Sequence, residues 1–271
     1  MAALSPRAPA GATPGGPARP RGETRPRGSG EPLLEARGLT RRFGGLAAVE
    51  DVDFALDRGG VHAVIGPNGA GKTTFVSLLS GRLPPSEGTV SFEGRDVTRL
   101  PAWRRVRLGI AYTFQITSIY PALAARENVA IAAQGEVLRR GGSEREAEAA
   151  TDHALARVGL SHLAAIRAGE LAYGHQRLLE VAMGLALAPT LLILDEPTQG
   201  LSDPEIEGFL ALVREIAAEA TVLLIEHNMP VVMALARRIT VMDRGRVLAE
   251  GRPEAVRADP AVQAAYLGAP A

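Results

Sequence analysis

Three short, largely apolar runs stand out from the mixed pattern of polar and apolar positions along the chain. They cover residues 61–65, 191–194 and 221–225. Runs of this length are typical of strands that are buried on both faces of a parallel sheet. Between the last two runs, residues 205–220 repeat their apolar positions with the spacing of an amphipathic helix. This succession of buried strand, helix and buried strand predicts an α/β fold.

Shorter elements flank these strands. Residues 33–37 and 47–54 alternate polar and apolar positions around Gly44 and Gly45, which predicts two strands joined by a turn. Residues 123–170 are rich in Ala, Glu and Arg with helical spacing, so we expect an inserted helical subdomain at about residues 123–175. Further strands are expected at 89–92, 109–114, 239–242 and 246–249, and further helices at 75–79, 102–108, 178–187 and after Pro253 and Pro260.

Composition narrows the class of protein. The chain of 271 residues has a formal net charge of zero, which argues against a general nucleic-acid binder, and it has no cysteine for disulfides or thiolate metal sites. Residues 1–30 contain Pro, Gly and Arg without an apolar run, so we expect a disordered tail, not a secretory signal, before a domain at residues 31–268. No stretch of 18 apolar residues exists, so any membrane role must come from a partner.

The segment from Gly66 to Thr74 contains the only lysine of the chain, Lys72, although Lys and Arg together number 30. Its pattern, G-x-x-x-x-G-K-[ST], is that of a phosphate-binding loop, in which backbone N–H groups surround the phosphates. A compact ammonium fits inside such a loop, whereas a broad guanidinium does not. We therefore expect Lys72 to contact the β- and γ-phosphates of ATP and the Thr73 hydroxyl to reach Mg²⁺. The alternative is a chance Gly-rich turn, but a strand before the segment and a helix after it oppose this. The predicted nucleotide-binding residues are Gly66, Pro67, Asn68, Gly69, Ala70, Gly71, Lys72, Thr73 and Thr74.

Polar residues at three strand ends supply the remaining candidate chemistry. Asp195 and Glu196 follow the run at 191–194, and their side chains should point in different directions because side chains alternate along a strand. Asp195 then fits a Mg²⁺ ligand, and Glu196 fits a general base that polarises the attacking water. His227 ends the next strand, where sheet ligands normally lie, although an isolated histidine there is more often structural. Gln115 offers an amide that can touch both Mg²⁺ and the water.

Residues 33–268 resemble the nucleotide-binding subunits of ABC transporters, whose motifs occur here in the same order. By this resemblance, the fold combines a RecA-like core with an antiparallel β subdomain and an inserted helical subdomain. Phe43 looks like the aromatic residue that stacks on adenine, Gln115 like the Q-loop, and His227 like the switch histidine. The signature motif is expected at residues 171–175, with Ala172, Tyr173 and Gly174 contacting nucleotide. The resemblance implies a head-to-tail dimer with each ATP between two chains.

Two positions depart from the commonest family pattern. Ala172 lacks the hydroxyl of the usual serine, and Ser202 stands where the D-loop aspartate usually lies, with Asp203 one residue later. These changes could weaken the ATP site that this signature completes, so the two sites of a dimer need not be equal.

The segments 43–46, 113–115 and 171–174, together with the chain end, look like the ATPases of branched-chain amino acid importers, and specifically the larger of their two ATPase subunits. The implied partners are transmembrane permease subunits, a second ATPase subunit and, indirectly, a solute-binding protein, at the cytoplasmic face of the plasma membrane. The same family also serves urea and short amides.

Two other classes of protein compete with this interpretation. A soluble ABC ATPase acting on ribosomes or DNA usually carries two ATPase modules or a long coiled coil, and neither occurs in this sequence. A P-loop kinase would need an acceptor pocket, and Glu196 followed by a signature-like motif argues against it. An ATP-hydrolysing importer subunit that binds no nucleic acid is the prediction that the residues favour.

Overall fold

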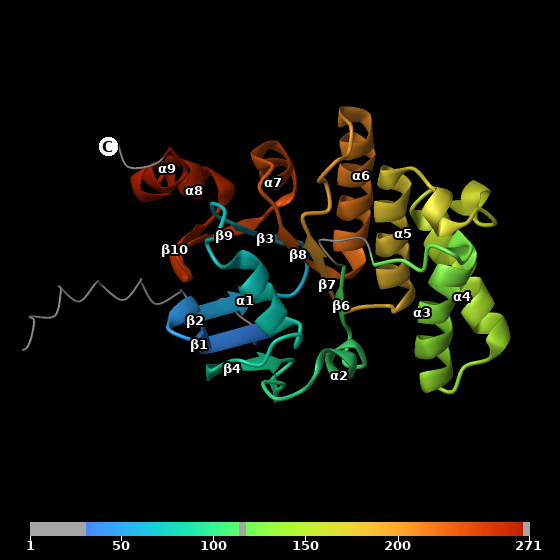
Figure 1. The fold of residues 1–271 in the computed structure, drawn as a ribbon, viewed down its shortest axis with the longest axis horizontal. Helices are drawn as coiled ribbons and strands as arrows, with labels where there is room; N and C mark the ends of the chain where they lie inside the picture. Colours follow the sequence, from blue (N-terminus) through green and yellow to red (C-terminus); the bar gives the residue numbers. More distant parts are fainter. Residues whose placement is uncertain (1–30, 114–117, 268–271) are drawn as a thin grey trace, which may run out of the picture. The chain divides into compact units, whose positions relative to one another are not determined.

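The computed structural model describes residues 31–113 and 118–267. The predictions for the tail at residues 1–30 and for Gln115 lie outside these ranges. Within the described part the fold is α/β, as predicted, and it contains two sheets and a group of packed helices (Figure 1).

The larger sheet carries the three apolar runs side by side. Its strand order is β10 (Arg246–Gly251), β9 (Arg238–Asp243), β3 (Val61–Ile65), β8 (Thr221–Ile225), β7 (Leu191–Asp195) and β6 (Ile110–Tyr112). All neighbouring pairs are parallel except β10 and β9, which form an antiparallel hairpin at the two expected strands. Because parallel strands end at the same edge, the residues that follow β3, β7 and β8 lie close together.

The smaller sheet is antiparallel, with the order β2 (Leu46–Leu56), β1 (Leu34–Phe43), β4 (Glu87–Phe92) and β5 (Arg95–Asp96). Strand β1 continues to Phe43, beyond the predicted end at residue 37, because it pairs with β2 on one side and with β4 on the other. Register shifts along both pairings absorb the irregular alternation that ended the sequence pattern early.

Helices cover the larger sheet and extend beyond it. Three of them, α3 (Ala125–Arg139), α4 (Glu144–Arg157) and α5 (Tyr173–Ala186), pack against one another at one end of Figure 1. Two 3₁₀ turns, Ser161–Leu163 and Ala168–Glu170, separate α4 from α5. The other helices are α1 (Lys72–Leu79), α2 (Ala102–Val106), α6 (Asp203–Glu219), α7 (Met229–Leu235), α8 (Pro253–Ala258) and α9 (Pro260–Leu267).

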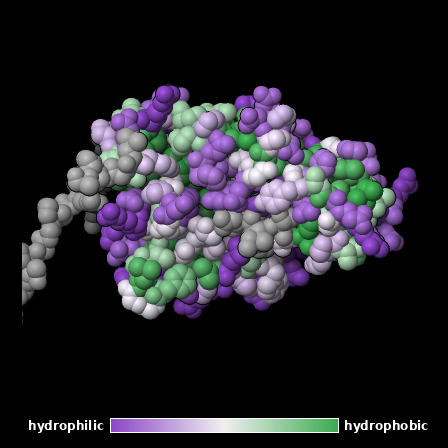
Figure 2. Space-filling view, turned by 45° about the horizontal axis from the view of Figure 1, so that its top comes forward, coloured by the Kyte–Doolittle hydropathy of each residue, from purple (hydrophilic) through white to green (hydrophobic). Residues whose placement is uncertain are grey.

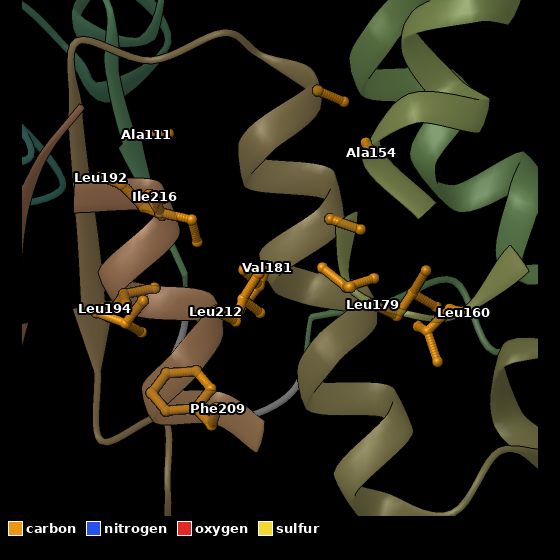
Figure 3. Close-up of a cluster of buried hydrophobic side chains, with 14 of the residues drawn as sticks. Ala111, Ala154, Leu160, Leu179, Val181, Leu192, Leu194, Phe209, Leu212 and Ile216 are labelled. Carbon is orange, nitrogen blue, oxygen red and sulfur yellow. The ribbon is translucent and has the colours of Figure 1, made fainter. Parts of the chain in front are cut away.

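Alternation along the central strands divides the core between the two faces of the larger sheet. In β7, Leu192 and Leu194 pack with α5 and α6, as Figure 3 shows around Leu212. The intervening Leu191 and Ile193 face the opposite cluster, which includes the buried residues of α1 and of the smaller sheet. A strand that is apolar at every position therefore serves both faces at once, which is the reason for its continuous apolar run.

The P-loop helix α1 is held at its end by a buried arginine. The Arg105 guanidinium donates through Nη1 to the carbonyl oxygens of Leu78 and Leu79 at 2.9 and 2.7 Å. It also reaches the carbonyls of Thr98 and Leu100. Carbonyl groups at a helix end lack partners within the helix. Arg105 supplies a donor for the carbonyl of Leu79 and a further donor for that of Leu78, which also accepts from the N–H of Gly81 at 3.3 Å. Burial lowers the pKa of Arg105 to about 10, and Asp96 opposes this shift.

The surface of the described residues is mixed. On the face shown in Figure 2, hydrophilic residues cover most of the area, and hydrophobic residues form separate patches. Between residues 31–113 and 118–267, no helix combines the length and the apolar character needed to cross a membrane.

Candidate nucleotide-binding site

The P-loop joins β3 to α1, and its glycines are required by the backbone path. Gly66 and Gly71 have φ angles of 153° and 94°. A Cβ atom at Gly66 would lie 2.2 Å from the Met242 carbonyl oxygen, and one at Gly71 would lie 2.3 Å from that of Ala48. Only glycine fits these contacts. The α1 N-cap is Gly71, which has no side-chain cap, so the first N–H groups of the helix remain available to an anion.

Lys72 is folded back over the loop. Its Nζ donates to the carbonyl oxygens of Gly66 at 2.7 Å and Pro67 at 3.1 Å, and the residue is only 7% exposed. Burial lowers the pKa of Lys72, whereas the nearby charges of Glu196 and Asp195 raise it. The ammonium is thus held by carbonyl groups that a phosphate could replace.

A cleft of about 570 Å³ is lined by the P-loop and by Glu196, the second of the two predicted acids. Residues 46–48, Glu196, Arg244 and Gly245 line it, together with Asn68, Gly69, Ala70, Gly71, Lys72, Thr73 and Thr74. Phe43, the predicted adenine contact, ends β1 near this lining, and it is half-exposed with the Arg41 guanidinium 4.8 Å from its ring centre. An exposed aromatic ring and an open cleft beside a phosphate-binding loop have the layout that a nucleotide needs.

Asp195 ends β7 with one oxygen bonded and one oxygen free. The Tyr112 hydroxyl donates to its Oδ2 at 2.6 Å, while its Oδ1 is buried and has no hydrogen-bond partner. Burial raises the pKa of Asp195, and the bond from Tyr112 opposes the shift. A buried, unpartnered carboxylate oxygen is the kind of ligand that Mg²⁺ uses in nucleotide sites, so the residues present fit this ion.

Glu196 departs from the strand in a left-handed conformation, with φ of 48°. Its backbone N–H donates to the Ile225 carbonyl at 2.9 Å, and its Oε1 lies 3.8 Å from Nδ1 of His227. The structure therefore brings Glu196 and His227 together across two neighbouring strand ends. Glu196 is largely buried, whereas the His227 side chain is 54% exposed and open to approach from outside the chain.

Glu226 is a buried residue of the site that the sequence interpretation missed. Its Oε1 accepts from the backbone N–H and the hydroxyl of Thr198, and its Oε2 accepts from the N–H groups of His227 and Asn228 at 2.9 and 3.1 Å. The carboxylate thus ties the segment after β7 to the segment after β8. The signal was present in the sequence, because a charged residue that continues an apolar strand needs partners when buried.

The predicted signature residues lie apart from the cleft. Ala172 is the N-cap of α5, and Tyr173 and Gly174 form its first turn. A Cβ atom at Gly174 would lie 2.2 Å from Oε1 of Glu205, so this turn packs closely on the start of α6. Among the described residues that line the P-loop cleft, none comes from this turn. A single chain therefore contains both the P-loop and the signature turn but does not place the signature turn at its own P-loop cleft.

The last described helix, α9, also contacts the P-loop. Tyr266 in α9 stays 39% exposed, but partial burial of its hydroxyl end raises its pKa to about 12, and a hydrogen bond with the backbone of Gly66 opposes the shift. Val262 of the same helix is buried in a cluster that contains Ile65, the residue before the loop. This contact was also not predicted, since nothing in the local sequence indicates where α9 docks.

Comparisons with known proteins agree with the motifs. The family described as "ABC transporter" matches residues 49–199, and the family described as "Branched-chain amino acid ATP-binding cassette transporter" matches residues 246–271. The chain is 40% identical over 252 residues to the high-affinity branched-chain amino acid transport ATP-binding protein BraF of Pseudomonas aeruginosa, covering 88% of this chain and 98% of that protein. It is 38% identical over 253 residues to the corresponding protein LivG of Escherichia coli, with the same coverage.

The solved structures that are similar to this chain are also ATP-binding cassettes of ABC transporters. The fold is similar to that of a nucleotide-free ATP-binding cassette from an ABC transporter, with a TM-score of 0.78 and 30% identity over 88% of this chain and all of the other. It is also similar to the ADP conformation of MJ1267, an ATP-binding cassette of an ABC transporter, with a TM-score of 0.77, 30% identity and the same coverage.

Proposed function

The chain belongs to the ABC transporter family of ATP-binding proteins, and we propose that it is the ATP-hydrolysing subunit of an importer for branched-chain amino acids. The observation that carries the nucleotide part is the cleft in which Lys72 and Glu196 share one lining. The cargo is supported by the C-terminal family match at residues 246–271 and by the names of the two relatives.

In this proposal the P-loop binds the triphosphate of ATP. The N–H groups of residues 66–74 surround the β- and γ-phosphates, and Lys72 exchanges its carbonyl partners for phosphate oxygens. Thr73 and the free Oδ1 of Asp195 hold Mg²⁺, which when bound offsets the charge of the phosphates. Phe43 supplies an aromatic face for the adenine ring.

Glu196 acts as the general base in the proposed reaction. Its carboxylate takes a proton from the water that attacks the γ-phosphate, and the bond between the γ-phosphorus and the bridging oxygen to the β-phosphate breaks. His227, 3.8 Å from Glu196, orients the γ-phosphate and the water. Because the hydrogen bond that the Glu196 N–H donates to the Ile225 carbonyl restrains the Glu196 backbone, the carboxylate is positioned by the sheet edge itself.

The separation of the signature turn from the cleft supports a dimer as the active form. Ala172, Tyr173 and Gly174 of one chain would contact the ATP that the P-loop of a second ATPase chain binds. With the hydroxyl of the usual serine absent at Ala172, the backbone N–H groups and Gly174 make this contact. We propose that transmembrane permease subunits carry the solute, and that this subunit lies on their cytoplasmic side.

Reconstitution in liposomes tests the function. The chain is co-expressed with its permease partners, and ATP hydrolysis is measured with a solute-binding protein loaded with leucine, with urea, or with neither. Stimulation by leucine is the expected result. Stimulation by urea alone would refute the amino-acid cargo, and no stimulation by either would refute coupling to import. The Glu196→Gln variant should bind ATP but not hydrolyse it, and brisk hydrolysis would contradict the role of the base.

A further inference from the structure

The hydroxyl group of Tyr112 contacts Asp195, the acid with an unpartnered oxygen, from a neighbouring strand. Tyr112 ends β6, which pairs in parallel with β7, and its side chain reaches past the strand to Asp195. The O–H donates to Asp195 Oδ2 at 2.6 Å, a short bond that is typical of a donor to an ionised carboxylate. These two residues are 83 positions apart in the sequence, so only the order of strands in the sheet brings them together.

This bond distinguishes the two carboxylate oxygens of Asp195 as ligands for a cation. The residue is 1% exposed, its Oδ2 is occupied, and its Oδ1 is the oxygen without a partner. A carboxylate that could rotate would present either oxygen or both to a cation. With Tyr112 on one lone pair of Oδ2, Oδ1 is the oxygen whose lone pairs are both free.

We propose that Tyr112 is a positioning residue, which orients Asp195 so that Oδ1 alone binds the divalent cation that accompanies ATP. The proposal rests on the nucleotide site described above and deepens it. It makes the affinity for Mg²⁺ with ATP depend on a phenol that never touches the nucleotide. Preorganising a ligand in this way contributes to metal affinity because the ligating orientation exists before the cation binds.

The surroundings of the ring allow this role to be separated from packing. The Arg82 guanidinium lies 4.9 Å from the centre of the Tyr112 ring. Both residues line a cavity of about 250 Å³, together with Glu180 and Met183. Replacing Tyr112 by Phe removes one oxygen, with its bonds to Asp195 and Arg82, and keeps the ring against Arg82 and the cavity wall, so the fold should be preserved.

The test compares ATP affinity with and without metal. The Glu196→Gln protein, which should not turn over ATP, serves as the reference, and its Kd for ATP is measured in EDTA and in excess Mg²⁺. The ratio of the two values, Kd in EDTA divided by Kd in Mg²⁺, reports the contribution of the metal. Adding Tyr112→Phe should lower this ratio about tenfold, the scale of one hydrogen bond to a charged group, and leave the Kd in EDTA unchanged.

Two controls give the result its meaning. Tyr120→Phe removes the same atom from an exposed tyrosine and should leave the ratio unchanged. In an Asp195→Asn background, Tyr112→Phe should cause no further fall, because the group that it positions has lost its charge.

An unchanged ratio in Tyr112→Phe would overturn the proposal and leave the nucleotide site standing. The proposal would also be overturned, in favour of a packing effect, by either of two results. One is that Tyr112→Phe lowers the Kd ratio equally with Asp195 intact and in the Asp195→Asn background. The other is that Tyr112→Phe weakens ATP binding equally in EDTA and in Mg²⁺. Failure of the reference protein to bind ATP under both conditions would overturn this proposal together with the proposed function.

Discussion

Replacing Glu226 by Gln should destabilise the protein more than its small change in shape suggests. The carboxylate is fully buried and accepts four hydrogen bonds, two at each oxygen, from Thr198, His227 and Asn228. Glutamine keeps one oxygen and converts the other into an NH₂ group. At the Oε2 position the NH₂ faces the N–H groups of His227 and Asn228. At the Oε1 position it faces the N–H of Thr198, while the Thr198 hydroxyl can turn and accept from it, so at least one donor opposes another in either orientation.

The magnitude follows from the bonds that are lost. Hydrogen bonds to a charged group contribute about 1.5–3 kcal/mol each; at least one of the four is lost and the others become weaker bonds to a neutral amide, so the cost is about 3 kcal/mol. Relief from burying a charge reduces this cost, and the clash between facing donors increases it. We therefore expect the free energy of unfolding to fall by about 3 kcal/mol in Glu226→Gln. Because Glu226 also holds the backbone next to His227, ATP hydrolysis should fall with it.

Urea unfolding of the nucleotide-free protein, followed by far-UV circular dichroism, measures the loss. Glu207→Gln is the matched control, since Glu207 lies on the exposed side of α6, and its effect should stay below about 0.5 kcal/mol. If Glu226→Gln costs no more than this control, the idea that the carboxylate joins the two strand ends is wrong.

Three further outcomes follow from the described contacts. Burial raises the pKa of Asp195, so its contribution to stability is present at low pH and is lost as the pH rises through the raised value. Asp195→Asn should therefore increase the melting temperature of the nucleotide-free protein at neutral pH. The same variant should abolish the added stabilisation by ATP with Mg²⁺, and thermal shift measures both effects. Gly174→Ala should force Glu205 away from α5 and lower hydrolysis at least several-fold while the affinity of the monomer for ATP stays unchanged, as binding and turnover assays would show. Tyr266→Phe removes the hydrogen bond to Gly66 and should weaken ATP binding about two- to fivefold in equilibrium titrations, and an unchanged affinity would mean that α9 does not influence the P-loop.

Much of the architecture was predictable because it depends on local pattern. The runs around Val61, Leu191 and Thr221 are apolar at nearly every position, and the structure places all of them in the interior of one sheet. The Gly-rich segment ending in Lys72 specifies a loop, since its glycines take conformations that other residues rarely adopt. Some differences between prediction and structure lie in element ends, as in β1, whose length is set by pairing with two partners. Others are short elements that were not predicted at all, namely α7 and the two-residue strand β5.

What could not be predicted depends on which strands become neighbours. The sequence order of the strands is β3, β6, β7, β8, but the sheet order is β3, β8, β7, β6. The contact of Tyr112 with Asp195 depends on the parallel pairing of β6 with β7, which the long helical segment separates in the sequence, and nothing near Tyr112 in the sequence indicates it. Arg105 and Tyr266 were missed for the same reason, because each reaches a backbone group that is distant along the chain.

The charges around the P-loop explain why one acid of the site needs a fixed orientation. Lys72 lies close enough to Asp195 and Glu196 for both carboxylates to oppose the effect of burial on its pKa. The same carboxylates would repel the phosphates of ATP, and in a buried site that repulsion is poorly screened. In the proposed site, a cation on the free Oδ1 of Asp195 would offset this repulsion, and Glu196 would remain available to the attacking water. If Tyr112 orients Asp195 as proposed, Oδ1 is the oxygen that would meet this cation.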